Sequence, residues 1–205
     1  GLNMIENKDT VYSITYSILQ KLDNSRDTSS TKALLANIRN SIDKGFTANI
    51  DALAYIFANL PDEYLGNSRE LSIYEESILT ALQMYAIHQQ ANTNSILKVK
   101  YEKNERKQDI GEAFSAIRVN ESESIDKRFN SMITSGNFRE LRHHLRQMIK
   151  LLKSRSDVKV DYAKLAEDLY WFMIGRKDEV RLRWARSYFK YRKKEEMKGD
   201  IQNEK

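Results

Sequence analysis

The chain contains no cysteine, one proline and seven glycines in 205 residues. The absence of cysteine excludes disulfide bonds, thiolate metal sites and cysteine nucleophiles, and it agrees with a reducing compartment, so we expect a cytoplasmic protein. Because β-sandwiches need many turn residues, the scarcity of glycine and proline argues against an all-β fold. Residues 77–97 form the longest stretch without charge, but glutamine, asparagine and histidine interrupt it, so we expect no membrane contact.

Residues that could support catalysis are equally sparse. The three histidines are His88, His143 and His144, and the adjacent pair would point about 100° apart on a helix, too far to share a metal or a proton. The sequence has neither an HExxH motif nor a glycine-rich phosphate loop. Paired acids such as Glu75 and Glu76 stand at predicted helix starts, where the helix dipole favours them. We therefore predict no catalytic residue, no bound metal, no cofactor and no enzymatic activity.

Apolar residues recur at three- and four-residue spacing along most of the chain, which is typical of α-helices. Capping residues strengthen the pattern: Ser72 is followed three positions later by Glu75, and Asp109, Asn137 and Asp161 precede apolar runs. The predicted helices span residues 8–22, 32–43, 48–59, 72–90, 109–118, 124–136, 137–153 and 162–174, with a last one from 178 through the 190s. Gly45 and Gly175 stand where closing residues are expected. We predict an all-α protein of about nine helices packed as two helical sub-bundles.

The helical pattern fails between residues 91 and 108, where the sequence is first polar and then rich in lysine and glutamate. We interpret this segment as a charged connection. It would join an N-terminal helical sub-bundle at residues 1–90 to a C-terminal basic helical sub-bundle at 109–195, followed by a tail at 196–205. Together the two sub-bundles are predicted to form one module.

Positive charge is concentrated toward the C-terminus. Residues 1–80 carry 7 basic and 11 acidic side chains, whereas residues 81–205 carry 27 and 18, so the net charge changes from −4 to +9. Such asymmetry favours a polyanionic partner.

Two predicted helices carry a basic face beside an apolar one, when each residue advances by about 100°. In segment 137–153 the basic face holds Arg139, Arg142, Arg146, Lys150 and Lys153, and in the last helix it holds Arg183, Arg186, Lys190, Lys193 and Lys194. Arg181 and Arg192 fall on the apolar side, where we expect them to pair with carboxylates at the edge of the core rather than to meet a ligand. A single basic face is usually just solvated, but two in one half of the chain favour binding to a phosphate backbone, which releases counterions without reading base identity.

An ordered series of short segments then points to a family. These segments are 109–118 (DIGEAFSAIR), 125–129 (IDKRF), 141–146 (LRHHLR), 160–165 (VDYAKL), 168–171 (DLYW) and 180–189 (VRLRWARSYF), with 32–39 (KALLANIR) in the first half. The series closely resembles the CasB family, the small subunit of Cascade, the type I-E CRISPR surveillance complex.

The resemblance implies a non-catalytic subunit that contacts the DNA strand displaced when guide and target pair. Its implied partners are the Cascade backbone and large subunits, the crRNA-containing complex, the non-target DNA strand and a second copy of itself. The basic residues that match family positions are Lys32, Arg39, Arg118, Lys127, Arg128, Arg142 and Arg146. Helical geometry adds Arg139, Lys150, Arg183, Arg186 and Lys190 as candidate nucleic-acid contacts.

Two alternatives stay open at this point. The basic faces could dock onto acidic partner subunits without touching DNA, in which case the free protein would ignore oligonucleotides at low salt. A metal-free nuclease is disfavoured, because the sequence shows no carboxylate cluster that could hold Mg²⁺ beside a scissile phosphate.

Overall fold

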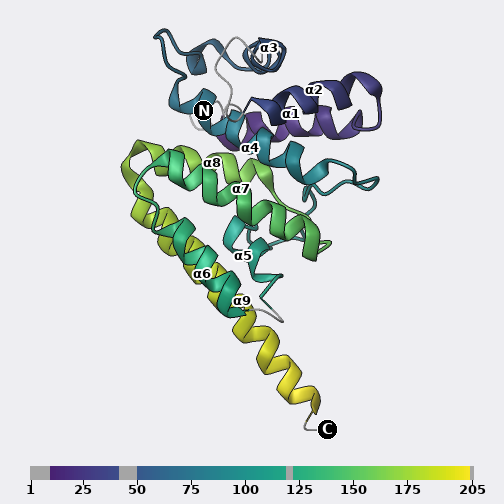
Figure 1. Cartoon of the computed structure of the whole chain (residues 1–205), viewed down its shortest axis with the longest axis vertical. Helices are drawn as coiled ribbons and strands as arrows, with labels where there is room; N and C mark the ends of the chain where they lie inside the picture. The colour runs from purple at the N-terminus through teal and green to yellow at the C-terminus, as the bar shows by residue number, and fades with distance from the viewer. Residues whose placement is uncertain (1–9, 42–49, 119–121, 204–205) are drawn as a thin grey trace.

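A computed structural model describes residues 10–41, 50–118 and 122–203, with Ser122 and residues 191–203 described by their backbone alone. Its elements are α1 (Val11–Asn24), α2 (Ser29–Asn40), α3 (Ile50–Ala58), the 3₁₀ turn η2 (Asp62–Tyr64), α4 (Ile73–Gln89), α5 (Ile110–Ser115), α6 (Ser122–Ile133), α7 (Phe138–Arg155), α8 (Tyr162–Trp171), the π-helical turn η3 (Phe172–Arg176) and α9 (Lys177–Asn203) (Figure 1). Extended pairing in these described ranges is limited to an isolated bridge between Leu97 and Val160. The predicted all-α class is confirmed.

The helices α4, α5, α7 and α8 begin at the capping residues that the sequence predicted, whereas α1, α2 and α6 begin at Val11, Ser29 and Ser122 rather than at residues 8, 32 and 124. The Ser72 hydroxyl accepts a hydrogen bond from the Glu75 backbone, and the Glu75 carboxylate accepts one from the Ser72 backbone at 2.7 Å. Asp109, Asn137 and Asp161 each accept a bond from the backbone nitrogen three residues later. These contacts satisfy donors that the first turn of a helix leaves without partners.

The junction between α8 and α9 lies close to the predicted helix end at residue 174. α8 is followed directly by η3, in which the dihedral angles leave the helical region at Ile174 and Gly175 before α9 begins. Gly175 has a φ of +100°, a left-handed conformation that glycine adopts without a Cβ clash, so its predicted closing role is confirmed. Gly45, the other predicted closing residue, lies outside the described residues. α9 continues to Asn203, so residues 196–203, expected as a tail, are helical.

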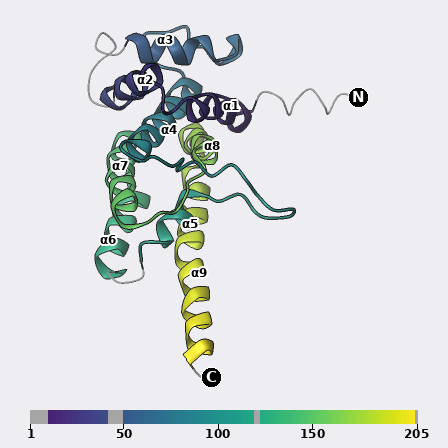
Figure 2. The same ribbon diagram turned by 90° about the vertical axis from the view of Figure 1, so that its right-hand side faces the viewer.

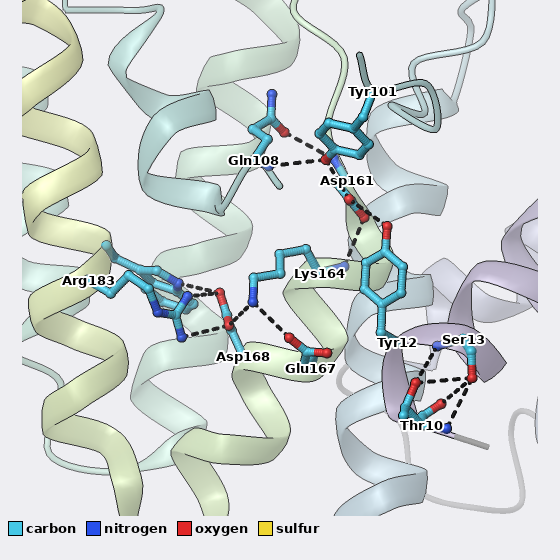
Figure 3. A network of polar contacts seen from close by, with 11 residues as sticks. Thr10, Tyr12, Ser13, Tyr101, Gln108, Asp161, Lys164, Glu167, Asp168 and Arg183 are labelled. Atoms are coloured by element: carbon cyan, nitrogen blue, oxygen red, sulfur yellow. Dashed lines mark hydrogen bonds and ion pairs between the residues drawn. The ribbon is translucent and has the colours of Figure 1, made fainter. Parts of the chain in front are cut away.

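The charged connection at residues 91–108 forms no helix, yet it is held against the body of the protein. Leu97 pairs with Val160 in the isolated bridge. Tyr101 donates to Asp161 Oδ2 at 2.6 Å, and the Gln108 carboxamide oxygen accepts from the Asp161 backbone at 3.1 Å (Figure 3). Both ends of the segment are therefore fixed to the start of α8.

α4 occupies the centre of the molecule, and its side chains are buried from Ser77 to Gln89. α1, α2, α7 and α8 all pack against it (Figures 1 and 2). A helix that is buried on every side is expected to be apolar all round, and the run from Ile78 to Ile87 fits that expectation. α8 contacts α1 and α4 as well as α9, so helices from both halves of the chain contribute to one hydrophobic cluster. The division into two sub-bundles at residues 91–108 stays a prediction.

The buried His88 gives the fold a pH dependence. Its side chain is 1% exposed and its Nδ1 lies 2.8 Å from the Tyr162 hydroxyl. Burial, together with the charge of Lys153, lowers the pKa of His88 to about 4. The unfolded chain therefore takes up this proton first, and stability is lost as the pH falls from about 6.5 toward 4. At pH 5 we expect the low pKa of His88 to reduce the free energy of unfolding by about 2 kcal/mol relative to pH 7.5. Urea unfolding at pH 7.5 and 5.0 measures this difference.

The matched variant is His88→Gln, which keeps a polar group near Tyr162 and does not titrate. In this variant the free energy of unfolding should differ less between pH 7.5 and pH 5.0 than it does in the wild-type protein. An unchanged difference in this variant would mean that another group is responsible.

Candidate nucleic-acid interface

The cations predicted on the basic face of segment 137–153 lie along one edge of α7. The adjacent face of the helix is buried in the core through Leu141, Leu145, Met148, Ile149 and Leu152. Arg139 and Lys150 are exposed, whereas Arg142, Arg146 and Lys153 are half-buried. In the described part of the chain, neither Arg139 nor Lys150 takes part in an ion pair. The helix therefore holds these two charges toward solvent.

Both ends of this edge adjoin α4. Near the start of α4, the Arg142 guanidinium lies 3.8 Å from the Glu76 carboxylate. Near its end, Lys153 donates to the Ile87 carbonyl at 3.1 Å and to the Gln90 carbonyl. A cation suits this position because the carbonyls at a helix C-terminus carry partial negative charge. The basic edge of α7 thus runs along α4.

α2 brings two further predicted cations to the same end of α4. Lys32 is exposed, and the half-buried Arg39 donates to the Ala86 carbonyl at 3.3 Å. Burial lowers the pKa of Lys153, and the nearby charge of Arg39 lowers it further, so the two cations are close enough to repel. Figure 2 shows α2 and α7 on the same side of the molecule.

We call this surface the basic track, because it joins cations that are far apart in the sequence. It consists of Lys32, Arg39, Lys153, Lys150, Arg146, Arg142 and Arg139. α6 packs against α7 on the same side of the molecule (Figure 2), and its Lys127 and Arg128 are exposed. Eight of the twelve predicted contacts (Lys32, Arg39, Lys127, Arg128, Arg139, Arg142, Arg146 and Lys150) are therefore in the basic track or on α6 beside it.

Arg118 is held inside the protein. It is 8% exposed and forms two hydrogen bonds with the Asp126 carboxylate, at 2.8 and 2.9 Å. Although burial disfavours its charge, Asp126 raises the pKa of Arg118 above its ordinary value. The guanidinium also lies 4.7 Å from the centre of the Tyr188 ring. Arg118 thus links the end of α5 to α6 and α9.

Arg183 is engaged in an ion pair too, although 35% of its side chain stays exposed. It meets Asp168, which is 0% exposed on α8, with two N–O distances of 2.8 and 2.9 Å (Figure 3). The other two predicted contacts on α9, Arg186 and Lys190, are exposed. α9 packs mainly against α5 and extends away from α7 (Figure 2), so these two cations lie on a different helix from those of the basic track. Lys193 and Lys194 lie among the residues described by backbone alone.

Arg181 pairs with a carboxylate as expected, but its partner Asp178 is 90% exposed rather than at a buried edge, and Arg192 lies among the residues described by backbone alone. The Arg181 guanidinium lies 3.6 Å from Asp178 and also donates to the Ser135 carbonyl. Reasoning from the sequence missed Arg26, whose side chain borders the same end of α4 as Lys32 and Arg39. No helical periodicity marks Arg26, because it lies in the turn between α1 and α2 and only the tertiary structure brings it there.

Metal-binding and membrane-spanning features are both missing from the described ranges. No group of three histidine, cysteine or acidic side chains within those ranges is placed to hold a metal ion. Likewise, none of the helices in the described part of the chain has the length and apolar character needed to cross a bilayer.

Comparison with known proteins identifies the family of this chain. Residues 34–189 match the family model described as CRISPR-associated protein Cse2. A search of curated proteins found no match.

Solved structures share the fold. CasB from Thermobifida fusca aligns with a TM-score of 0.67 and 24% identity, covering 87% of this chain and 97% of its own. A CRISPR-associated protein of the Cse2 family from Thermus thermophilus gives 0.62 and 21%, with coverage of 85% and 97%. A chain of a CRISPR RNA-guided surveillance complex gives 0.70 and 13%, with coverage of 93% and 99%.

Proposed function

The chain belongs to the Cse2 family of CRISPR-associated proteins, and from that premise we propose that it is the non-catalytic small subunit of a type I-E CRISPR Cascade complex. In this role it binds nucleic acid without sequence preference and stabilises the R-loop by holding the displaced non-target DNA strand. The observation that supports the proposal is the basic track, in which Arg39 of α2 and Lys153 of α7 both donate hydrogen bonds to carbonyl groups near the end of α4. The similarity to a chain of a CRISPR RNA-guided surveillance complex supports the assembly.

Modest protein contacts are sufficient for such a role. Replacing a DNA duplex by an RNA–DNA hybrid is nearly balanced in free energy, so contacts to the released strand tip the equilibrium. Each cation that meets a phosphate releases condensed counterions, which provides affinity without base identity. From Arg139 to Lys153 the α7 edge is about 21 Å long, enough to follow about six stacked nucleotides.

The ion pairs refine which residues would touch the strand. We assign binding to the basic track and to Lys127 and Arg128, and we assign Arg118 and Arg183 to holding α5, α6, α8 and α9 together. Arg186 and Lys190 would form a second and separate contact surface on α9.

The direct test replaces two exposed residues of the track, Arg139→Gln with Lys150→Gln. Neither side chain packs in the core, so the circular dichroism and the melting temperature should stay unchanged. Affinity for single-stranded DNA should fall about tenfold at low salt. The slope of log K against log salt should become shallower by about 1.4, since each lost phosphate contact removes about 0.7. Both quantities can be measured by fluorescence anisotropy with a labelled oligonucleotide.

The control makes the same change of net charge elsewhere, Lys103→Gln with Lys177→Gln, both exposed. An equal loss of affinity in the control would show that only net charge matters. If DNA binding is unaffected in the track variant while assembly with the other Cascade subunits fails, the basic faces serve protein docking instead.

A further inference from the structure

A cavity of about 400 Å³ lies where the basic track meets the N-terminal helices. The α1–α2 turn contributes Arg26 and Asp27 to its walls, and α2 contributes Lys32, Leu35 and Arg39. Residues 89–93, at the end of α4, close the remaining side. This volume is within the range of about 300–1,000 Å³ typical of small-molecule pockets.

The wall formed by residues 89–93 is held in place by hydrogen bonds. The Gln89 carboxamide donates to the Asn92 and Asn94 carbonyls at 3.0 and 2.9 Å and accepts from the Ile96 backbone at 3.0 Å. Asn92 in turn donates to the His88 carbonyl at 2.8 Å. This wall of the cavity is therefore preformed.

Positive charge predominates around this cavity. Arg26 is matched by Asp23 at 3.8 Å, and Asp27 adds one exposed carboxylate. Lys32 and Arg39 line the cavity, and Lys153 reaches its rim through the Gln90 carbonyl. The C-terminus of α4 offers only about half an elementary charge, too little to neutralise Arg39 and Lys153 together. An anionic group bound here would relieve the repulsion between them.

The size of the cavity and the residues that line it indicate which kind of molecule carries the anionic group. A carboxylate side chain would leave most of 400 Å³ empty, whereas a nucleotide would fill it. Leu35 lines the cavity but is only 4% exposed. The exposed residues 90–93 therefore offer the surface against which a base can lie, and among them Gln90 and Thr93 place an amide and a hydroxyl. The basic track leads directly to Lys153 and Arg39, so a strand bound along α7 would arrive at the cavity.

We propose that this cavity takes one nucleotide turned out of the bound single strand, with its phosphate between Arg39, Lys32 and Lys153 and its base against the wall formed by residues 90–93. The inference rests on the proposed function, since the strand along the basic track delivers the nucleotide. Turning a base out of a single strand costs less than from a duplex, because no base pair is broken. Such a site would set the register of a strand that the rest of the track holds without preference.

The test uses the full chain with ¹⁵N and methyl labels, followed by NMR titration. The probes are thymidine 5′-monophosphate (dTMP), inorganic phosphate and a glutamate-rich peptide. We expect dTMP to shift the signals of Leu35 and of residues 91–93 saturably, and to bind at least tenfold more tightly than inorganic phosphate. Arg39→Gln should weaken dTMP binding at least tenfold. Lys32→Gln, at an exposed position that cannot disturb the core, should weaken it about threefold, and Lys103→Gln should leave it unchanged.

Each contrary result has a distinct meaning. Equal affinity for phosphate and dTMP would overturn the nucleotide site and leave an anion site only. Tighter binding of the acidic peptide than of dTMP would overturn it in favour of an acidic protein partner. If a single-stranded oligonucleotide binds but dTMP leaves these signals unmoved, the nucleotide site is wrong while the proposed function still stands. If the oligonucleotide does not bind at low salt, both the nucleotide site and the proposed function are wrong.

Discussion

Replacing Gly111 with alanine is expected to destabilise the protein by about 3 kcal/mol or more. Gly111 lies in α5 where that helix crosses α9. A Cβ atom placed on it would collide with the Trp184 carbonyl oxygen and lie 2.9 Å from the carbonyl carbon. These are backbone atoms of a long helix, so no side-chain rotation can remove the clash, and α5 must move away from α9. Urea unfolding followed by circular dichroism measures the loss.

The matched control is Gly136→Ala, between α6 and α7. The nearest atom to a Cβ at this position is the Glu140 carboxylate oxygen at 3.7 Å, an ordinary contact distance. We expect a change within about 0.5 kcal/mol. Wild-type stability in the Gly111→Ala variant would contradict the close packing of α5 on α9.

Replacing Asp168 with alanine is expected to cost about 3–5 kcal/mol, because it removes one partner of a buried ion pair and leaves the other without compensation. Asp168 is fully buried and accepts hydrogen bonds from Arg183 at 2.9 Å and from the Trp184 indole at 2.8 Å (Figure 3). Lys164 adds a third partner, a cation at 3.5 Å. Thermal and urea unfolding of the variant test this expectation.

The control changes a residue that lies on the same helix as Asp168 and also contacts Lys164. Glu167→Gln removes the more exposed carboxylate that Lys164 contacts at 2.7 Å, and it should cost less than about 1 kcal/mol. A loss equal to that of Asp168→Ala would contradict the central position of Asp168.

The ion pair between Asp168 and Arg183 also predicts the role of Arg183. Arg183→Gln should lower stability and leave the affinity for single-stranded DNA unchanged at a temperature where the variant is folded. If affinity instead falls as far as in the variant of Arg139 and Lys150, then Arg183 contacts nucleic acid, as the helical projection of the sequence predicted.

Most of the secondary structure could be predicted from the sequence, because its signals are local. Ser72 with Glu75 and Asp109, Asn137 and Asp161 satisfy backbone donors within the next turn, so their effect does not depend on the rest of the fold. The apolar and basic faces of α7 follow in the same way from the helical repeat alone. The π-helical turn Phe172–Arg176, which contains Gly175, has no distinct sequence pattern, so only the position of the break at Ile174 and Gly175 could be predicted.

The sequence by itself determined that the chain is helical, where the four helices with clear caps (α4, α5, α7 and α8) begin, and that its C-terminal part is basic. Only the tertiary structure decided which cations are available to a ligand. Arg183 shares the basic face of its helix with Arg186, yet one meets a buried carboxylate on α8 and the other is exposed. Arg39 and Lys153 lie far apart in the chain but repel each other over the end of α4. The reason is physical: helical periodicity acts over a few residues, whereas electrostatic interactions depend on distances in space that only packing sets.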